Sequence, residues 1–330
     1  PPGLAIDLQA IAHQLARRRP GQSPLTTQRQ EADELEILSG VFEGETTGTP
    51  IGFLIRNSDA RSKDYSHLKD SFRPGHADYT YTKKYGRRDY HGGGRASARE
   101  TACRVVGGAI AEQLLQQHGI SAPIAWVQHI HRHRLPTDIV PANRREVDRY
   151  LTRCPDPATD SAMTTAIEQA RAQGDSLGGV VACRVQTLPA GLGEPVFDKL
   201  TARLAAAMMS LPATRGFEIG MGFSATQLTG SEHNDALSAN SESDFASNRA
   251  GGVLGGISNG MPLVFRVAFK PTSTIASPQG SINAEGEAVN VEGKGRHDPC
   301  VLPRAVPIVE AMTSLVLADL LLSQAANKLV

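Results

Sequence analysis

Apolar residues in the first part of the chain change from helical spacing to strand-like spacing. Over residues 4–19 they recur every three or four positions, which predicts a short helix that ends before Pro20. Over residues 36–56 they alternate with polar residues, which predicts strands joined by a turn at residues 45–50.

The rest of the chain mixes the same two periodicities. The elements do not repeat as short strand–helix–strand units, and no G-x-G-x-x-G follows a strand, which argues against a dinucleotide-binding fold. We therefore expect an α+β protein, built as one large domain over residues 1–330 or as two closely packed halves. The spacing predicts helices at 98–118, 160–173, 195–211 and 303–328, and strands at 124–133, 178–188 and 262–269.

A polar stretch over residues 58–95 follows neither periodicity. A segment of this length inside a compact protein is usually functional or disordered. It contains several tyrosines, among them Tyr79, Tyr81 and Tyr85, and disordered segments are poor in aromatic residues. The functional interpretation is therefore favoured.

Composition and charge exclude several classes of protein. Hydrophobic residues make up 40% of the 330 residues, enough for a sizeable core. Lys and Arg number 34, as do Asp and Glu, so the net charge is zero, whereas a general nucleic-acid binder would carry a basic excess. The apolar runs look too short or too interrupted to cross a membrane, and the four scattered cysteines do not suggest a disulfide framework. We expect a reducing compartment, with neither nucleic acid nor membrane as a partner.

Two polar segments could each bind a phosphate or a carboxylate. Residues 92–101 combine three glycines with Arg95, Ser97 and Arg99 at the start of a predicted helix, which suits an anion. Lys270 and the hydroxyl groups that follow it come directly after a predicted strand and could do the same. Each segment could instead be ordinary surface, as a capped helix entry or a polar turn.

Two other segments carry titratable groups. His76 stands beside a proline–glycine turn and could act as an acid or base near neutral pH, or could simply be solvated. Residues 293–300 bring Arg296, His297 and Asp298 together, either as reactive groups or as a salt-bridged turn.

Three further patterns have simpler interpretations. The basic run at residues 17–19 could bind phosphate but is more typical of a solvated helix end. The glycine pairs of residues 251–256 suit either a flat ligand or tight backbone packing. His129, His131 and His133 would share one face of a strand, but no acidic or cysteine partner follows at a zinc-ligand spacing, so we expect no metal site.

The order of these segments resembles that of the chorismate synthase family. Members of that family carry, in sequence, RR-x-PG, PGHADYTY, GGGR-x-SARET, SN-x-AGG-x-LGG, KPTS, and RHDPC followed by AVPI-x-EAM. The resemblance covers essentially the whole chain. The matching positions are 17–21, 74–81, 92–101, 247–256, 270–273 and 296–312.

The resemblance implies a fold and a reaction. The family fold is a β-α-β sandwich of two similar halves, assembled as a homotetramer. Its reaction is the anti-1,4-elimination of phosphate from 5-enolpyruvylshikimate 3-phosphate, which gives chorismate and is the last common step of aromatic amino acid biosynthesis in the shikimate pathway. The reaction requires reduced FMN but involves no net redox change. An external flavin reductase, with NADPH as the reductant, would supply the reduced flavin. The enzyme would be cytoplasmic, or stromal in a plant or alga.

The resemblance also implies roles for particular residues. His76 would lie by the pyrimidine edge of the flavin and stabilise its reduced form, while Asp298 would assist proton removal. Arg18 and Arg99 would bind the anionic groups of the substrate. Ser97 would belong to both the catalytic and the FMN-binding sets, and the FMN contacts would come from Arg95, Ala96, Ser97, Pro212, Ala213, Gly255, Lys270, Pro271, Thr272, Ser273, Thr274 and Arg296.

Two departures from the family pattern affect these expectations. The family opens with a GESHG segment, whose histidine acts as an acid toward the departing phosphate, and residues 1–330 do not contain it. We therefore expect that a segment ahead of Pro1 belongs to the protein. A usually basic position holds Pro24, so one substrate cation would be missing or supplied from elsewhere. The alternatives are a flavin- or phosphate-binding protein without catalysis and, against the zero net charge, a nucleic-acid-binding module.

Overall fold

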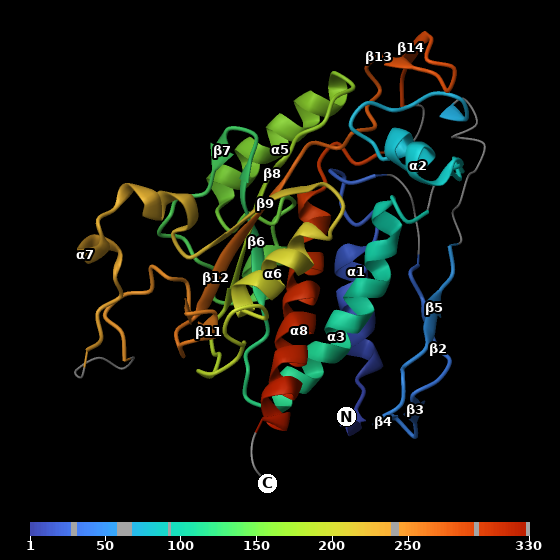
Figure 1. Ribbon diagram of the computed structural model, residues 1–330. Coiled ribbons are helices and arrows are strands. Elements are labelled where there is room, and N and C mark those ends of the chain that lie inside the picture. Colours follow the sequence, from blue (N-terminus) through green and yellow to red (C-terminus); the bar gives the residue numbers. More distant parts are fainter. Residues whose placement is uncertain (28–31, 58–67, 92–93, 239–243, 294–296, 328–330) are drawn as a thin grey trace.

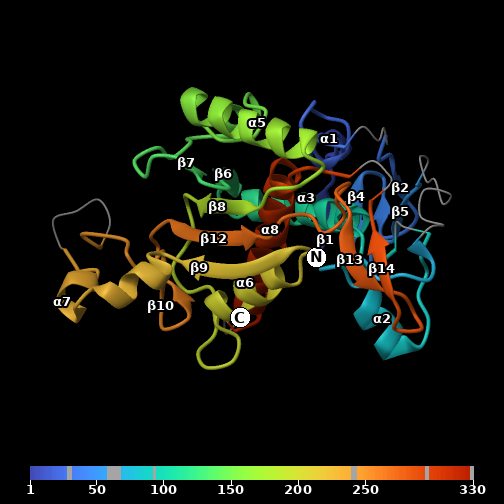
Figure 2. The same cartoon turned by 90° about the horizontal axis from the view of Figure 1, so that it is seen from above.

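The structure is a computed structural model that describes residues 1–27, 32–57, 68–91, 94–238, 244–293 and 297–327. Its elements form three layers, with helices between two layers of strands (Figure 1). Figure 2 shows α3 and α8 in the middle layer, with β8 and β12 on one side and β1 and β4 on the other. The β-α-β sandwich and the α+β class are therefore confirmed.

The larger strand layer is an antiparallel five-stranded sheet in the order β7–β6–β8–β12–β9. Alternate residues of β12 are buried, among them Phe265 and Val267, and they pack with Val181 and Cys183 of β8 in the core. The predicted strand at 262–269 is therefore present, although Val264 and Ala268 on its other face are apolar too. The strands are β6 (Ile124–Ile130), β7 (His133–Arg134), β8 (Gly179–Val185), β9 (Thr214–Ile219) and β12 (Leu263–Phe269).

The middle layer is organised around α8 (Leu302–Ala326), which contacts three other helices and two strands of the large sheet. By length and hydropathy α8 could cross a membrane, although 78% of its most apolar 18-residue window is buried inside the protein. The expectation that every apolar run is too short or too interrupted to cross a membrane is therefore wrong for α8. Its burial is that of an apolar core helix. The other helices of the layer are α1 (Leu8–Arg18), α3 (Thr101–Gln117) and α6 (Leu200–Met209).

The smaller strand layer consists of two separate sheets. One has the order β1–β4–β3 and the other pairs β2 with β5, which contacts α3. These strands are shorter than those of the large sheet, so the two strand layers differ in size. Their bounds are β1 (Pro2–Ala5), β2 (Leu35–Ile37), β3 (Val41–Phe42), β4 (Glu45–Thr47) and β5 (Phe53–Ile55).

Shorter elements surround the sandwich and include the segments that form the site. The turn η2 (Ala98–Glu100) leads into α3, and α2 (Asp78–Tyr85) follows the segment that contains His76. The others are α4 (Arg144–Asp148), α5 (Pro157–Ala172), η3 (Gly222–Gln227), α7 (Gly230–His233), β10 (Val253–Leu254), β11 (Ile257–Ser258), β13 (Gln279–Ile282) and β14 (Ala288–Val291).

Most of the predicted elements are present, including the helices at 4–19, 160–173 and 195–211, which appear as α1, α5 and α6. The predicted helices at 98–118 and 303–328 appear as α3 and α8, and the predicted strands at 178–188 and 262–269 appear as β8 and β12. The predicted turn at 45–50 is wrong in part, because Glu45–Thr47 forms β4, which pairs with both β1 and β3. The sequence analysis also missed α2 and β9.

The three alternating histidines do not share one face of a continuous strand. The pairing register of β6 shifts between Val127 and His129, and His131 has a φ of 53° in the turn that leads to β7. The predicted strand over 124–133 is therefore two strands with a bulge and a turn, and the assumed common face is wrong.

The basic run at the end of α1 is buried, so its assignment as a solvated helix end is wrong for two of its three arginines. Arg17 and Arg18 are 5% and 1% exposed. Arg17 forms ion pairs with Glu310 and with Asp148, and Arg18 pairs with Asp33 at 3.0 Å. Carboxylates far away in the sequence compensate these buried charges.

Gly108 permits the close crossing of α3 and α8. A Cβ at this position would lie 2.4 Å from both the Cα and the Cβ of Ala311. We expect Gly108→Ala to destabilise the protein by about 1–3 kcal/mol, because overpacking outweighs the better helix propensity of alanine. The measurement is the urea or thermal unfolding midpoint at fixed protein concentration.

The neighbouring glycine provides a matched control for this prediction. A Cβ at Gly107 would lie 3.5 Å from Leu315, an ordinary contact, so Gly107→Ala should be neutral or mildly stabilising. If both variants unfold at the same midpoint, the close crossing does not determine the effect.

Candidate active site

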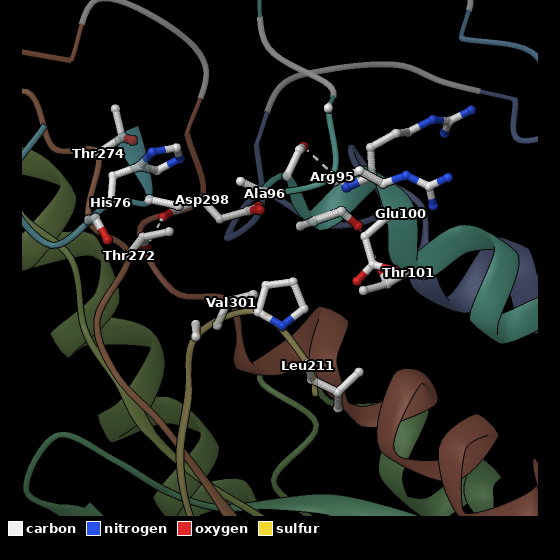
Figure 3. Close-up of a pocket in the computed structure, with 18 of the residues that line it drawn as sticks. His76, Arg95, Ala96, Glu100, Thr101, Leu211, Thr272, Thr274, Asp298 and Val301 are labelled. Atoms are coloured by element: carbon white, nitrogen blue, oxygen red, sulfur yellow. Dashed lines mark hydrogen bonds between the residues drawn. The ribbon is translucent and has the colours of Figure 1, made fainter. Parts of the chain in front are cut away.

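A cavity of about 1130 Å³ lies where five stretches of the chain meet, within residues 18–27, 73–104, 210–215, 269–274 and 297–308. The N-terminal turns of α2, α3 and α8 all contribute to its lining. Ligand pockets usually measure ~300–1,000 Å³, so this cavity has room for more than one small molecule. Figure 3 shows His76, Thr272, Thr274 and Asp298 on one side, and Arg95, Ala96, Glu100 and Thr101 on the other.

The lining is strongly cationic although the whole chain carries no net charge. Among the described lining residues are nine Arg or Lys and only four Asp or Glu. Such an excess in a concave site attracts anions and strengthens hydrogen bonds to phosphate or carboxylate oxygens. The nine cations are Arg18, Arg73, Arg88, Arg95, Arg99, Arg104, Arg215, Lys270 and Arg304.

The segment around His76 is fixed against the loop that follows β12. Lys270 Nζ and Ser273 Oγ donate to the carbonyl oxygen of Gly75 over 3.1 Å and 2.7 Å. Gly75 has a φ of 67°, so glycine suits this turn. On the other side of the turn, Nδ1 of His76 lies 2.8 Å from Oδ1 of Asp78. Contacts on both sides therefore position the imidazole at the cavity wall.

Asp298 has a carboxylate that is 9% exposed, with both oxygens in defined contacts. Oδ1 accepts from the backbone N–H of Thr27 at 2.9 Å, and Oδ2 forms an ion pair with Arg304 at 2.6 Å. Thr272 Oγ1 donates to the Asp298 carbonyl oxygen over 2.7 Å. Asp298 thus connects three segments that are distant in sequence.

The opposite wall is the entry to α3. Ser97 is the N-cap of η2, and its hydroxyl oxygen accepts from the N–H of Arg99 at 3.2 Å. The hydroxyl hydrogen of Ser97 can be donated to a ligand. Arg95 is exposed and forms no ion pair with any residue in the described part of the chain, so it can bind an external anion.

Asp33 lies between two arginines that line the cavity. Its carboxylate pairs with Arg18 at 3.0 Å and also with Arg99. Burial, together with repulsion from Arg304, lowers the pKa of Arg18 to about 10, even though Asp33 acts in the opposite direction. A second anion beside Arg18 would therefore be electrostatically favourable.

Lys270 is also held in a cationic environment. Partial burial, and then the charge of Arg215, lower the pKa of its ammonium group. Arg215 lies on β9, the strand that the sequence did not predict, and it lines the same cavity. An anion between these two cations would relieve their repulsion.

Comparison with known proteins assigns a family to this arrangement. The sequence profile described as chorismate synthase matches residues 1–322. The chain belongs to the chorismate synthase family. Members of the family are lyases of class EC 4.2.3.5 and act in aromatic amino acid biosynthesis.

Individual relatives of the chorismate synthase family agree over almost the full chain. Chorismate synthase of Christiangramia forsetii is 53% identical over 329 residues, which covers 100% of this chain and 92% of the relative. That of Synechococcus sp. strain WH7803 is 56% identical over 326 residues, or 98% of this chain and 90% of the relative. A crystal structure of chorismate synthase superposes with a TM-score of 0.76 at 32% identity, covering 98% of this chain and 85% of that one.

Most residues that the family resemblance singled out meet in the cavity. Its lining includes the three predicted catalytic residues, His76, Ser97 and Asp298, and the predicted FMN contact Lys270. Gly255 lies in the turn between β10 and β11, outside the lining, and Pro271 is also absent from it. Arg296 lies outside the described residues. The other lining members of the predicted set are Arg18, Arg95, Ala96, Arg99, Pro212, Ala213, Thr272, Ser273 and Thr274.

Several lining residues were not singled out from the sequence. Arg73 stands directly before the segment 74–81, and Arg304 lies inside the segment 296–312, between RHDPC and AVPI, at the start of α8. Each forms an ion pair with an acidic residue of the site, Asp78 or Asp298. Both could have been found by considering every arginine within or directly beside a family segment. No sequence pattern pointed to Arg215, because it lies outside the family segments, on β9, a strand that was not predicted.

Proposed function

We propose that the protein catalyses the anti-1,4-elimination of phosphate from 5-enolpyruvylshikimate 3-phosphate to give chorismate, with reduced FMN bound in the same cavity. The observation that carries this proposal is the convergence of His76, Ser97, Lys270 and Asp298 on one cation-rich cavity. The substrate bears a phosphate and two carboxylates, and FMN bears another phosphate. Nine cations around one cavity match that demand.

The lining also fits the cofactor. Arg95, Ser97 and the hydroxyl of Thr274, which only accepts from Arg73 within the protein, offer donors for a phosphate and a ribityl chain. Leu211 and Val301 supply apolar surface for a flat ring, and Figure 3 places both on the floor between the two polar walls. Reduced FMN, when bound, supplies the electron-rich ring that the elimination requires.

The residues of the chain would bind the substrate, hold its charges and move a proton. Arg18 and Arg99, held together by Asp33, would bind anionic groups of the substrate. Asp298 would take up a proton when the ring of the substrate loses one. His76 would hold a proton at the edge of the cavity and offset negative charge on the cofactor.

An anaerobic assay tests the proposal directly. The full-length protein is mixed with chemically reduced FMN and 5-enolpyruvylshikimate 3-phosphate, and chorismate is measured by its absorbance or by mass spectrometry. Formation of chorismate and phosphate in equal amounts is the expected result. Tight FMN binding without formation of chorismate would instead favour the alternative function, a flavin-binding protein without catalytic activity.

Three further properties belong to the same proposal. The bacterial relatives favour a cytoplasmic enzyme, with a plastid location if the source is a plant or alga. We also expect a homotetramer, to be checked by light scattering. An external reductase using NADPH would supply reduced FMN, so NADPH alone with oxidised FMN should give no chorismate until such a reductase is added.

A further inference from the structure

The carboxylate of Asp78 is the centre of a buried ionic cluster below His76. Asp78 is 5% exposed, and its oxygens accept from Arg73 Nε at 2.7 Å and Arg73 Nη2 at 2.9 Å. Arg88 Nη1 lies 2.6 Å from Oδ1. Burial would raise the pKa of Asp78, but hydrogen bonds from Arg73 and His76 outweigh it and hold that pKa well below its ordinary value. Asp78 is therefore ionised and can only accept hydrogen bonds.

The same contacts decide the direction of the hydrogen bond to His76. Nδ1 of His76 lies 2.8 Å from Oδ1 of Asp78 and 3.0 Å from Nη2 of Arg73. Nδ1 cannot donate to the carboxylate and accept from the guanidinium at once. Arg73 already donates to both Asp78 oxygens, whereas Asp78 has no proton to give. The shorter contact is thus N–H donation from Nδ1 to Asp78.

We propose that Asp78 is a positioning residue that keeps neutral His76 protonated at Nδ1, so that Nε2 is the nitrogen available to a cavity ligand. His76 lines the cavity, its side chain is 23% exposed, and no residue in the described ranges hydrogen-bonds to Nε2. In this tautomer Nε2 accepts a proton or hydrogen bond from the ligand, and when protonated it donates one. This inference deepens the proposed function, in which His76 faces the flavin.

Neutron diffraction from deuterium-exchanged crystals of the wild-type protein tests the tautomer without any ligand. At a pH about two units above the ordinary histidine pKa, we expect deuterium on Nδ1 of His76 and none on Nε2. Deuterium on Nε2 alone would overturn the proposal. Because no flavin or substrate is present, this result is independent of the chorismate assay.

Asp78→Asn tests whether Asp78 causes the tautomer. Its amide cannot accept at both oxygen positions, so we expect deuterium to appear on Nε2, at least in part, and turnover to fall by roughly 10- to 100-fold. The FMN dissociation constant should change far less than turnover. A variant that folds and binds FMN but retains the wild-type tautomer would show that Asp78 is only structural. If the variant fails to fold, the wild-type neutron map still decides the question of the tautomer.

Discussion

Asp298→Asn should lower the turnover of 5-enolpyruvylshikimate 3-phosphate by about 10²- to 10⁴-fold, the usual contribution of a positioned proton acceptor. Asparagine keeps the size of the side chain but cannot take up a proton. The Thr27 N–H and Arg304 hold the carboxylate in place, so its position is set before a ligand arrives. The measurement is anaerobic turnover with pre-reduced FMN at saturating substrate.

A matched exposed aspartate controls for a general effect of removing a carboxylate. Asp198 pairs with Arg203 at 3.1 Å, but it is 58% exposed and lies outside the cavity lining. Asp198→Asn should therefore retain wild-type turnover. FMN binding should survive in Asp298→Asn, and near-wild-type turnover of that variant would remove Asp298 from the proposed proton path.

Glu310→Gln should destabilise the protein by about 3–5 kcal/mol, the usual effect of breaking a buried ion pair from one side. Glu310 is 1% exposed on α8 and pairs with Arg17 and with Arg144, the latter at 3.1 Å. It also accepts from the N–H of Ala125 at 2.9 Å. Its loss leaves the guanidinium groups of Arg17 and Arg144, which are 5% and 16% exposed, without their shared partner. The measurement is the free energy of unfolding in urea at fixed protein concentration.

Glu112→Gln is the control for this prediction, because Glu112 also pairs with Arg144, at 2.6 Å, but is 13% exposed. Removing it leaves Arg144 paired with Glu310, so the loss should be clearly smaller. Equal losses in the two variants would contradict the special role of the buried carboxylate.

The effect of Glu310 should also depend on pH. Burial would raise the pKa of Glu310, but Arg144 and Arg17 outweigh it and place that pKa below its ordinary value. When the pKa of a carboxyl group is lower in the folded state than in the unfolded state, its ionised form stabilises the fold. This stabilisation is complete at pH values above the unfolded-state pKa, and it is lost as the pH falls toward the folded-state pKa. The difference between wild type and Glu310→Gln should therefore be largest near neutral pH and shrink below about pH 4. If the stability difference between wild type and Glu310→Gln increased at acidic pH, this prediction would be contradicted.

The candidate site could be predicted in its parts but not in its connections. The family segments contain His76, Ser97, Lys270 and Asp298, and all four line the cavity. No sequence pattern indicated that Asp33 joins Arg18 to Arg99, because Asp33 lies outside the six segments that resemble the family. Ion pairs between distant residues depend on how the chain folds back, which local spacing does not encode.

Local sequence was enough to specify α3, α8 and β12. The helix α3 buries one face, α8 is apolar and buried over most of its length, and β12 is an apolar run of strand length. The order of residue types was also enough to indicate which polar segments carry the chemistry. Three other features emerged only with the packed layers: Glu45–Thr47 is a strand, β9 completes the large sheet, and Arg17 is buried against Glu310. Each of these depends on a partner remote in sequence, since strand pairing and charge burial are stabilised by contacts that exist only after the chain has folded back on itself.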